Sequence, residues 1–467
     1  MKKREQFKNL LTLGAAAGNI LIQTLAFSYV WFTVYAQAGA HYFVNGNYAL
    51  VALYAVMAFF INKAFGLLNI RKMRLFDLLF TQAISVVVIN GLTYLQLCLI
   101  ARWKLGENLL PILWLTGCNA VVVVLWNLLA RGINRLLYPP KRLLLIYGAY
   151  SPDNLIRNVL SRRDKYAIEE AISIDEPEQT LWNKMDAYDG VVLTDIPAEK
   201  RNELLKYCFS RDIRCYCVPK ISDILIRAAG NVHMFDTSLM VFKNMGLSID
   251  QRFLKRLFDI VFSAALGILI LPLMGVVALA IKVYDGGPVF FRQDRLTKDG
   301  KVFKLIKFRS MRVQDENAKY VLTRKNDDRI TPVGKILRAT HVDELPQIYN
   351  ILKGDMSFVG PRPECPGLAE TYGQIVPEFD FRLKVKAGLT GYAQVYGRYN
   401  TTPYDKLKLD LSYIVNYSFL LDMKLIALTV KVLFQKDSTE GIEDWQSSAA
   451  SREQLQKIGA DGDGAEE

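Results

Sequence analysis

The residues with the clearest chemical potential are two adjacent carboxylates, Asp343 and Glu344, in the run T-H-V-D-E-L-P-Q (340–347). Proline is tolerated only in the first turn of a helix, so the helix that contains Pro346 is expected to start close to Asp343. Both carboxylates would then lie at the positive end of the helix dipole, where anions and phosphate groups are stabilised. Adjacent carboxylates can also hold Mg²⁺, which keeps most of its waters and binds substrate phosphates. On spacing alone, two carboxylates that merely cap a helix explain the pair more simply.

Two helices are expected to hold this pair. Thr331 followed by Pro332 predicts a helix cap and a first helical residue, and the apolar face of that helix would consist of Val333, Ile336 and Leu337. The second helix is predicted by an apolar stripe with helical spacing, made of Leu345, Ile348, Tyr349 and Leu352.

Three cations precede the pair. Lys307 and Arg309 lie in a strand expected over 301–311, and they share one face because side chains alternate along a strand. Arg338 lies in the first of the two helices. Neighbouring cations on a rigid strand suit phosphate oxygens, although a solvated edge strand accounts for them equally well.

Two glycine-containing segments follow the pair. In G-P-R-P (360–363) a proline on each side removes backbone freedom, so Arg362 is presented at low entropic cost. Its guanidinium can then bind phosphate through two hydrogen bonds. The segment A-G-L-T-G (387–391) is predicted to be a turn that allows another backbone to approach closely. Purely structural turns remain the alternative for both segments.

The apolar run 257–281 is expected to position these residues at a membrane. It is long enough to span, but Pro272 lies at its centre, where proline kinks a helix. Basic residues flank the run on both sides, at Lys255, Arg256, Lys282, Arg292 and Arg295. Both ends therefore favour the cytoplasmic side. We expect a re-entrant helix that bends at Pro272, because a straight fifth span would put the phosphate-binding residues outside the cell.

Four apolar stretches precede this run, at 9–36, 47–68, 77–101 and 108–130. Each is near the roughly 20 residues of a spanning helix, and polar residues within them, such as Asn19 and Gln23, are expected to face other helices. Lys and Arg concentrate at the N-terminus, after the second stretch and after the fourth, which places the chain beyond 131 in the cytoplasm. The alternative is four buried helices of a soluble domain, but four such runs in succession are rare in water-soluble proteins.

From about residue 141, strand-like and helical segments alternate, which predicts a small parallel α/β domain. Strands are expected at R-L-L-L-I-Y-G-A, Y-A-I-E-E-A-I-S-I, D-G-V-V-L-T-D and I-R-C-Y-C-V-P-K, and helices near 152–163, 178–186 and 197–211. A dinucleotide site would need G-x-G-x-x-G after the first strand, where the chain reads G-A-Y-S-P. With one glycine, Cβ atoms would obstruct a pyrophosphate, so the module is predicted to be degenerate and non-catalytic.

Composition narrows the classes of partner. Hydrophobic residues make up 51% of the 467, so the net charge of +12 indicates an anionic membrane surface or phosphate-bearing substrates, and no nucleic acid. With three histidines, a His-rich metal centre is not expected. The six cysteines contain no CxxC pair and are predicted to be reduced; Cys215 and Cys217 suit strand alternation better than a metal site. No signal peptide is evident, because the first apolar run is too long and lacks a small-residue cleavage site.

The motifs K-F-R-S-M, D-E-L-P-Q, G-P-R-P and A-G-L-T-G occur in this order in the C-terminal half. Together they resemble the monotopic phosphoglycosyl transferases that start bacterial surface-polysaccharide assembly, and the domain order is similar to the large form of that family. The resemblance implies that Asp343 is the nucleophile and that Glu344 orients a metal or handles a proton, with Mg²⁺ held by both. The cations that would screen substrate phosphates are Lys307, Arg309, Arg338 and Arg362. The family commonly reads T-S-L-D-E-L-P-Q, so His341 and Val342 depart from it; His341 can tune the charge of the pair, but we expect an exposed bystander.

The resemblance also implies a fold class, that of a membrane protein of the bacterial inner membrane. Its parts would be a four-span α-helical bundle (1–138), a degenerate Rossmann-like α/β module (139–240), a mostly helical monotopic catalytic domain with a re-entrant helix (250–437) and a polar tail (438–467). On the cytoplasmic face it would transfer hexose-1-phosphate from a UDP-sugar to polyprenyl (undecaprenyl) phosphate through a covalent phospho-aspartate and release UMP. This would be the first membrane step of exopolysaccharide, capsule or O-antigen synthesis. The sugar stays open, and so does a homodimer.

Two other functions stay open at this point. A membrane-anchored nucleotide-sugar dehydratase or epimerase also joins membrane helices to an α/β domain, but it needs the intact dinucleotide loop that is missing here. A non-enzymatic scaffold for polysaccharide export is the other alternative, and the intact Asp343–Glu344 pair speaks against it.

Overall fold

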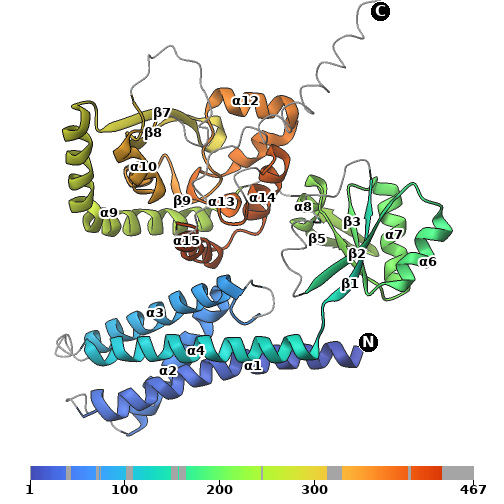
Figure 1. Cartoon of the computed structure of the whole chain (residues 1–467), viewed down its shortest axis with the longest axis horizontal. Coiled ribbons are helices and arrows are strands. Elements are labelled where there is room, and N and C mark those ends of the chain that lie inside the picture. Colours follow the sequence, from blue (N-terminus) through green and yellow to red (C-terminus); the bar gives the residue numbers. More distant parts are fainter. Residues whose placement is uncertain are drawn as a thin grey trace, which may run out of the picture. The chain divides into compact units, whose positions relative to one another are not determined.

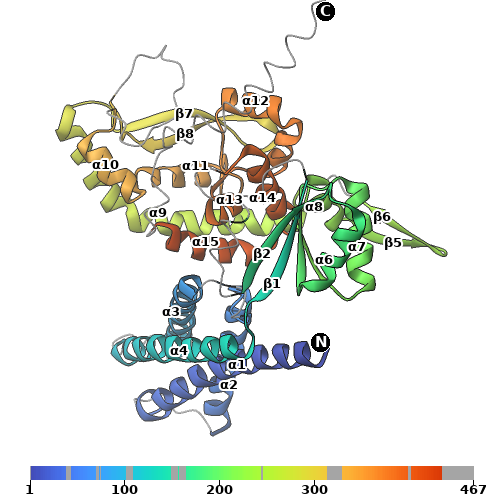
Figure 2. The ribbon, with the colours of Figure 1, turned by 45° about the vertical axis from the view of Figure 1, so that its right-hand side comes forward.

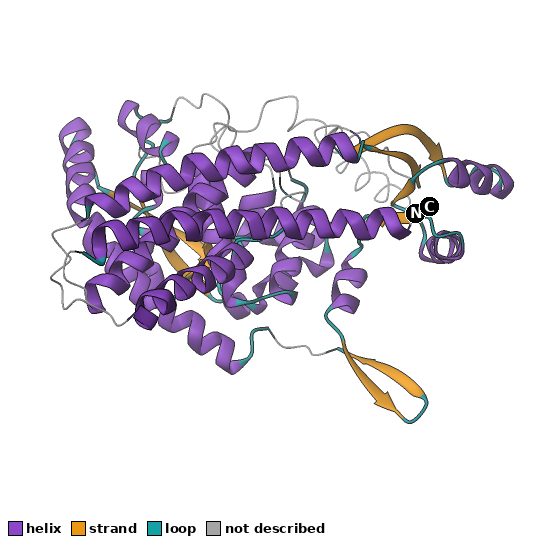
Figure 3. Ribbon diagram, turned by 90° about the horizontal axis from the view of Figure 1, so that it is seen from below, coloured by secondary structure: helices purple, strands orange, loops and turns teal. Residues whose placement is uncertain are grey.

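The computed structural model of the chain describes residues 2–37, 44–69, 73, 75–100, 109–148, 156, 165–242, 246–312, 329–397 and 401–433. The chain forms two compact units that divide between Lys220 and Ile221. Within the described residues, helices predominate over strands (Figure 1, Figure 3). The predicted tail 438–467, and the predicted helix 152–163 apart from Ile156, lie outside these residues.

Four long helices open the first unit and correspond to the four predicted apolar stretches. They are α1 (Lys2–Val30), which continues through the π-helical turn η1 (Trp31–Tyr35), α2 (Val44–Ala64), α3 (Leu75–Ile100) and α4 (Leu110–Leu137). Each is long and apolar enough to cross a membrane.

These helices expose many apolar side chains and bury several amides among their apolar core residues. Apolar side chains such as Leu25 are exposed, whereas Asn19 and Gln23 are buried. Asn19 donates to Gln82 Oε1 at 3.3 Å, and Gln82 donates to Asn62 Oδ1 at 3.4 Å. The expectation that such polar groups face other helices is confirmed, and an apolar exterior around helices that bury amides suits lipid surroundings.

The rest of the first unit contains the predicted parallel sheet, and its strand order is β2-β1-β3-β4. Its elements are β1 (Lys141–Tyr147), β2 (Tyr166–Ser173), α6 (Glu178–Ala187), β3 (Gly190–Thr194), α7 (Ala198–Ser210) and β4 (Arg214–Cys217). Gly148 follows β1, and a Cβ at this position would lie 2.0 Å from the main-chain oxygen of Asp195. Close approach of the neighbouring backbone therefore requires glycine here, whether or not a phosphate is bound.

The second unit begins with α8 (Ile221–Arg227), which packs on Phe379 and Leu407. An antiparallel hairpin follows, made of β5 (Gly230–Met234) and β6 (Thr237–Val241), and every residue of both strands is exposed (Figure 2).

Helix α9 (Ile249–Asp285) is the longest helix of this unit and contains Pro272. It starts at a capping box made by Ser248 and Gln251, and it ends at Gly286, whose φ of 69° is left-handed and suits glycine. Figure 1 shows α9 sharply bent, with two arms that run in different directions. Proline within the helix accounts for a bend, because it removes one hydrogen bond and clashes with the preceding turn.

Both ends of α9 pack on the same folded unit. Near its start, buried Lys255 forms an ion pair with Asp422 at 2.5 Å. Near its end, Val277 and Ile281 are buried with Phe308 from strand β8. The middle of the helix differs, since the side chains of Ile268, Leu269 and Leu271 are 67–78% exposed.

The remaining elements of the second unit surround the carboxylate pair. Strands β7 (Phe290–Leu296) and β8 (Val302–Phe308) are antiparallel, and β9 (Ser357–Val359) and β10 (Gly388–Thr390) are parallel. The helices are α10 (Pro332–Ala339), α11 (Gln347–Lys353), α12 (Pro366–Ile375), α13 (Tyr392–Tyr396), α14 (Pro403–Val415) and α15 (Phe419–Leu433), and the 3₁₀ helices are η2 (Lys298–Gly300), η3 (Val342–Glu344) and η4 (Pro377–Lys384).

Strand β8 confirms the strand predicted over 301–311, but the turn predicted at 387–391 is wrong. Residues 388–390 form strand β10, because their backbone pairs with β9. The close approach expected of this segment is present, since a Cβ on Gly388 would lie 2.1 Å from the amide nitrogen of Gly360.

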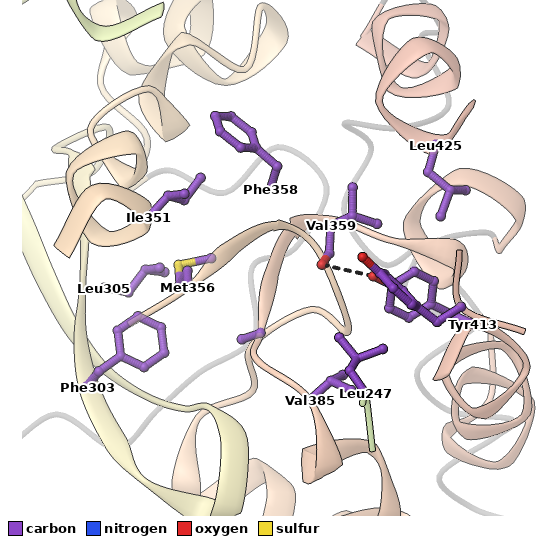
Figure 4. Packing of buried hydrophobic residues seen from close by; sticks show 12 residues of the cluster. Leu247, Phe303, Leu305, Ile351, Met356, Phe358, Val359, Val385, Tyr413 and Leu425 are labelled. Atoms are coloured by element: carbon purple, nitrogen blue, oxygen red, sulfur yellow. Dashed lines mark hydrogen bonds between the residues drawn. The ribbon is translucent and has the colours of Figure 1, made fainter. Parts of the chain in front are cut away.

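The core of the second unit joins β8, α11 and β9 to α14 and α15. Figure 4 shows Phe303 and Leu305 of β8 beside Met356, which precedes β9. It also shows the hydroxyl of Tyr413, which donates to the carbonyl oxygen of Val359 at 3.3 Å. This core holds β8 and α11, and the candidate site is built next to these two elements.

Candidate active site

The carboxylate pair lies in a tight connection between two helices. The Thr331 side chain accepts a hydrogen bond from the amide of Gly334 at 2.9 Å, so the predicted cap of α10 is confirmed. After α10 the chain reverses at His341, whose φ of 55° is left-handed. Asp343 and Glu344 follow in η3.

The predicted start of the second helix is wrong by about one turn. Helix α11 begins at Gln347, with Pro346 as its N-cap, so the pair lies before the helix in a separate 3₁₀ turn. Proline has no amide hydrogen to donate, and the left-handed His341 prevents a continuous helix from α10. The stabilising effect of a helix dipole on the pair is therefore smaller than expected.

The predicted apolar stripe of α11 is buried only in part, at Ile348. Tyr349 and Leu352 are exposed, whereas Gln347 and Asn350 are buried. The Asn350 side chain accepts from the amide of Ile306 and donates to the carbonyl oxygen of Lys304, at 3.1 and 2.9 Å. A polar side chain thus ties α11 to β8. In α10, likewise, Ile336 of the predicted apolar face is exposed.

Glu344 is fixed by two cations from different parts of the chain. Lys307 Nζ, from β8, lies 2.7 Å from Glu344 Oε1, and Arg362 Nη2, from the loop after β9, lies 3.4 Å from the same oxygen. The Glu344 side chain is 18% exposed, which leaves these contacts little screened by water. Charge-assisted hydrogen bonds of this kind orient the carboxylate.

The two carboxylates have opposite electrostatic environments. Burial raises the pKa of Asp343 to about 6, although the charge of Lys307 opposes this. Burial would also raise the pKa of Glu344, but the charges of Lys307 and Arg362 outweigh it and lower that pKa to about 2. Glu344 is therefore a permanent anion near neutral pH, and Asp343 is a basic carboxylate that is still mostly ionised.

Two of the predicted cations meet the pair in direct contact and a third acts on it at longer range. Arg338 contributes a positive charge that lowers the pKa of Asp343. Arg309 does not join them in the contacts described: it forms an ion pair with Asp285 at the end of α9. Strand β8 ends at Phe308, so the alternation that put Lys307 and Arg309 on one face no longer applies at Arg309.

His341 is half-buried, so the expectation of an exposed bystander is wrong. Its proximity to Glu344 follows from the reversal of the chain between α10 and η3. Burial lowers the pKa of His341, which favours the neutral imidazole.

The loop that presents Arg362 is held from behind by buried charges that sequence reasoning missed. Arg382 Nη2 donates to the carbonyl oxygen of Arg362 at 2.9 Å, and Arg382 Nε donates to Asp410 at 2.8 Å. Arg382 also pairs with Glu364 at 3.3 Å. From the front, Arg295 Nη1 donates to the carbonyl oxygen of Pro363 at 2.9 Å. No local sequence motif predicts these contacts, because the residues that make them are far apart in sequence.

A small pocket opens beside Glu344. It is lined by Arg295, Lys307, Glu344, Gln347, Arg362 and Leu389 among others. Three of these six side chains are cations, so the pocket suits an anionic ligand such as a phosphate. Gln347, the last residue of D-E-L-P-Q, is a further candidate ligand contact that the motif itself could have signalled.

The donor set for a metal is small. Among the residues that the structure describes, no group of three or more His, Cys, Asp or Glu side chains is placed to hold a metal ion. Asp343 and Glu344 supply carboxylate oxygens, which Mg²⁺ prefers, and it commonly takes only one or two protein carboxylates beside water and substrate phosphates. The pair is compatible with such a site but does not form a complete one.

Comparison with known proteins links this part of the chain to one family. Residues 250–436 match the family described as bacterial sugar transferase. A UDP-glucose:undecaprenyl-phosphate glucose-1-phosphate transferase of Klebsiella pneumoniae is 47% identical over 38% of this chain and 39% of its own length. A protein of the same name from Caulobacter vibrioides is 39% identical over 41% of this chain and 73% of its own length. The exopolysaccharide production protein PSS of Rhizobium leguminosarum is 42% identical over 38% of this chain and 93% of its own length.

The chain thus spans about two fifths of the Klebsiella relative but most of the other two. The family match contains the Asp343–Glu344 pair, the cations around it and α9.

Proposed function

The chain belongs to the family of bacterial sugar transferases, and we propose that it transfers a hexose-1-phosphate from a UDP-sugar to undecaprenyl phosphate and releases UMP. The names of the Klebsiella and Caulobacter relatives support these two substrates. The observation that carries the proposal is a buried Asp343 with a raised pKa beside a Glu344 that two cations hold in place.

Asp343 is the nucleophile in this mechanism. One of its carboxylate oxygens bonds to the β-phosphorus of the UDP-sugar while the bond from that phosphorus to the bridging oxygen breaks, and UMP leaves. An oxygen of undecaprenyl phosphate then bonds to the same phosphorus and releases the Asp343 carboxylate. One displacement between two anions becomes two steps on a fixed group. Glu344 is poorly suited to the attack, because Lys307 and Arg362 both bind its Oε1 and their charges lower its pKa, which makes it a weaker nucleophile.

The cations reduce the repulsion between the carboxylate and the diphosphate. Lys307 and Arg362 line the pocket, and Arg338 adds positive charge near Asp343. Fixed charges at the transferring phosphoryl group stabilise its transition state. Arg309 pairs with Asp285, and its role in this mechanism is to hold the end of α9 in position.

Mg²⁺ is the proposed cofactor. Asp343 and Glu344 would hold it together with the substrate diphosphate, since the pair alone offers few ligands. The bound ion would neutralise negative charge on the phosphates. Residue Glu344 keeps its charge at any pH near neutrality and so can serve as a ligand throughout the cycle.

A re-entrant α9 fits the way this helix is held. Straight, its 37 residues would be about 55 Å long, more than the roughly 30 Å hydrocarbon core of a bilayer. Its two ends nevertheless pack on one folded unit, through Lys255 and through Ile281, and its middle is apolar and exposed. A helix that enters one leaflet and leaves on the same side accounts for the packing of both ends on one unit and for the exposed apolar middle. The exposed Tyr349 and Leu352 of α11 would then face the same lipid surface.

Helices α1–α4 are proposed to span the membrane as a bundle, with the rest of the chain on the cytoplasmic face of the bacterial inner membrane. Their apolar exterior and buried amides support a lipid environment, and the Lys and Arg pattern of the sequence supports the orientation. UDP-sugars are too highly charged to cross a bilayer, so this orientation brings the donor to Asp343.

The direct test is release of UMP from a panel of UDP-sugars by the purified full-length protein in nanodiscs that contain undecaprenyl phosphate. The Asp343→Asn variant, whose amide is nearly isosteric but not nucleophilic, is expected to release no UMP. Asp380→Asn, a change at an exposed carboxylate of η4, is the matched control and should leave turnover unchanged. Turnover by Asp343→Asn close to that of the control would refute the assignment of the nucleophile. Activity that needs a nicotinamide cofactor would favour the dehydratase or epimerase alternative. No activity with any UDP-sugar would favour the scaffold alternative.

A further inference from the structure

Three thiols that are separated in sequence meet in the α/β module of the first unit. Cys215 and Cys217 lie on β4, with their sulfurs 3.6 Å apart. Cys208 reaches Cys215 from α7, and hydrogen bonds to Cys208 and Cys217 raise the pKa of Cys215. Cys215 is therefore the central, protonated member of a contiguous row of sulfurs.

Access to solvent differs along this row. Cys208 is 2% exposed and belongs to the hydrophobic core of the module, Cys215 is half-buried, and Cys217 is exposed. A small oxidant in solution thus meets Cys217 first. The neighbouring Cys215 is then the nearest thiol for any intermediate formed there.

We propose that Cys215 and Cys217 are a redox-active dithiol that peroxide converts reversibly to a disulfide. Cys217, as thiolate, attacks hydrogen peroxide; a sulfur–oxygen bond forms and the oxygen–oxygen bond breaks. The products are the Cys217 sulfenic acid and hydroxide, and the hydroxide becomes water by taking up the proton that the Cys217 thiol had released. The Cys215 sulfur then attacks that sulfur and expels a second water. In total, the two thiols lose two protons and two electrons, and one peroxide takes up both and becomes two waters.

The backbone of β4 permits this closure. Residues two apart on a strand have Cα atoms roughly 6.6 Å apart, which is at the upper end of the range of about 4.4–6.8 Å for disulfides. Only a small contraction of the strand is needed. Cys217 is the last residue of β4, and within the described part of the chain β4 is an edge strand that pairs with β3. A strand end at a sheet edge can shift with little loss of hydrogen bonding, whereas a central strand cannot.

Trypsin separates the three cysteines in a way that identifies the bond. Cleavage after Lys206, Arg211, Arg214 and Lys220 gives Y-C-F-S-R, which holds Cys208, and C-Y-C-V-P-K, which holds the other two. The full-length protein in nanodiscs is treated with hydrogen peroxide, alkylated, digested and analysed by mass spectrometry. The expected product is C-Y-C-V-P-K lighter by two hydrogens and without alkylation, restored to the doubly alkylated peptide by dithiothreitol.

Serine variants separate the roles of the three thiols. Cys208→Ser is the matched control and should form the same product. In Cys215→Ser, the sulfenic acid at Cys217 has no partner and should be trapped by dimedone, whereas Cys217→Ser should give no dimedone adduct. A doubly alkylated peptide after peroxide treatment of the wild type would overturn the proposal. So would a crosslink between the two peptides in its place, since that product would assign the bond to Cys208. UMP release plays no part in this readout, so the result is independent of the proposed transferase activity.

Discussion

Replacement of Lys307 by Gln tests the electrostatic account of the candidate site. Lys307 pairs with Glu344 at 2.7 Å, and its charge is the strongest one that lowers the pKa of Asp343. Without it, Glu344 keeps Arg362 as its close partner, at 3.4 Å, and its negative charge acts on Asp343 with less opposition. The pKa of Asp343 is therefore expected to rise above its present value of about 6.

The size of this rise fixes a measurable ratio of activities. Removal of an opposite charge a few ångströms away raises a carboxyl pKa by about 1–2, to roughly 7–8. At pH 7 the ionised fraction of Asp343 would then fall from about 90% to between roughly 50% and 10%. In the proposed mechanism only the ionised form of Asp343 attacks phosphorus, so activity is expected to be lost as the pH falls through the pKa. The ratio of kcat/KM at pH 9 to that at pH 7 is expected to be about 1 for the wild type and roughly 2–10 for Lys307→Gln.

The assay is initial-rate UMP release between pH 5 and pH 9, with Lys304→Gln as the control. Lys304 lies on the same strand but is exposed, so its removal should not move the profile. A constant loss of activity at every pH would mean that Lys307 only binds phosphate. An unchanged midpoint in Lys307→Gln would refute the account of how the pKa of Asp343 is set.

Three further outcomes are expected. Excess chelator should abolish UMP release and added Mg²⁺ or Mn²⁺ should restore it; full activity in chelator would exclude the proposed cofactor. Arg382→Lys keeps the positive charge but cannot make both hydrogen bonds of the guanidinium, to Asp410 and to the carbonyl oxygen of Arg362. Loss of about 1 to 1.5 kcal/mol of hydrogen bonding should raise the KM for the UDP-sugar roughly tenfold, with little change in kcat. Cysteines introduced at Phe253 and Tyr284, near the two ends of α9, should both resist a membrane-impermeant thiol reagent in intact cells and react once the inner face is exposed. Labelling at position 284 from outside would mean a fifth span.

Several features of this protein could be predicted from its sequence because they depend on interactions between neighbouring residues. The cap at Thr331, the strand that carries Lys307 and the four apolar helices depend on residues close together in the chain, and the structure contains each of them. The Asp343–Glu344 pair could also be identified, because residues that are adjacent in the sequence stay close together in any fold.

Other features depended on where elements end and on which distant segments meet. Arg309 leaves the pair because β8 stops at Phe308, and the residues behind Arg362 are joined to it by contacts that span up to 28 positions, as between Arg382 and Asp410. Cys208 reaches Cys215 only because α7 packs against β4.

Helix α9 shows most clearly which properties follow from the local sequence and which depend on long-range contacts. Composition gave this segment its length, its apolar character and Pro272, and these are local properties. Whether its two ends lie on one body is a matter of long-range packing, and the contacts of Lys255 with Asp422 and of Ile281 with Phe308 decide it. Sequence specifies such contacts only through the whole core that holds both partners, because each is worth little until the rest of the fold has brought the two side chains together.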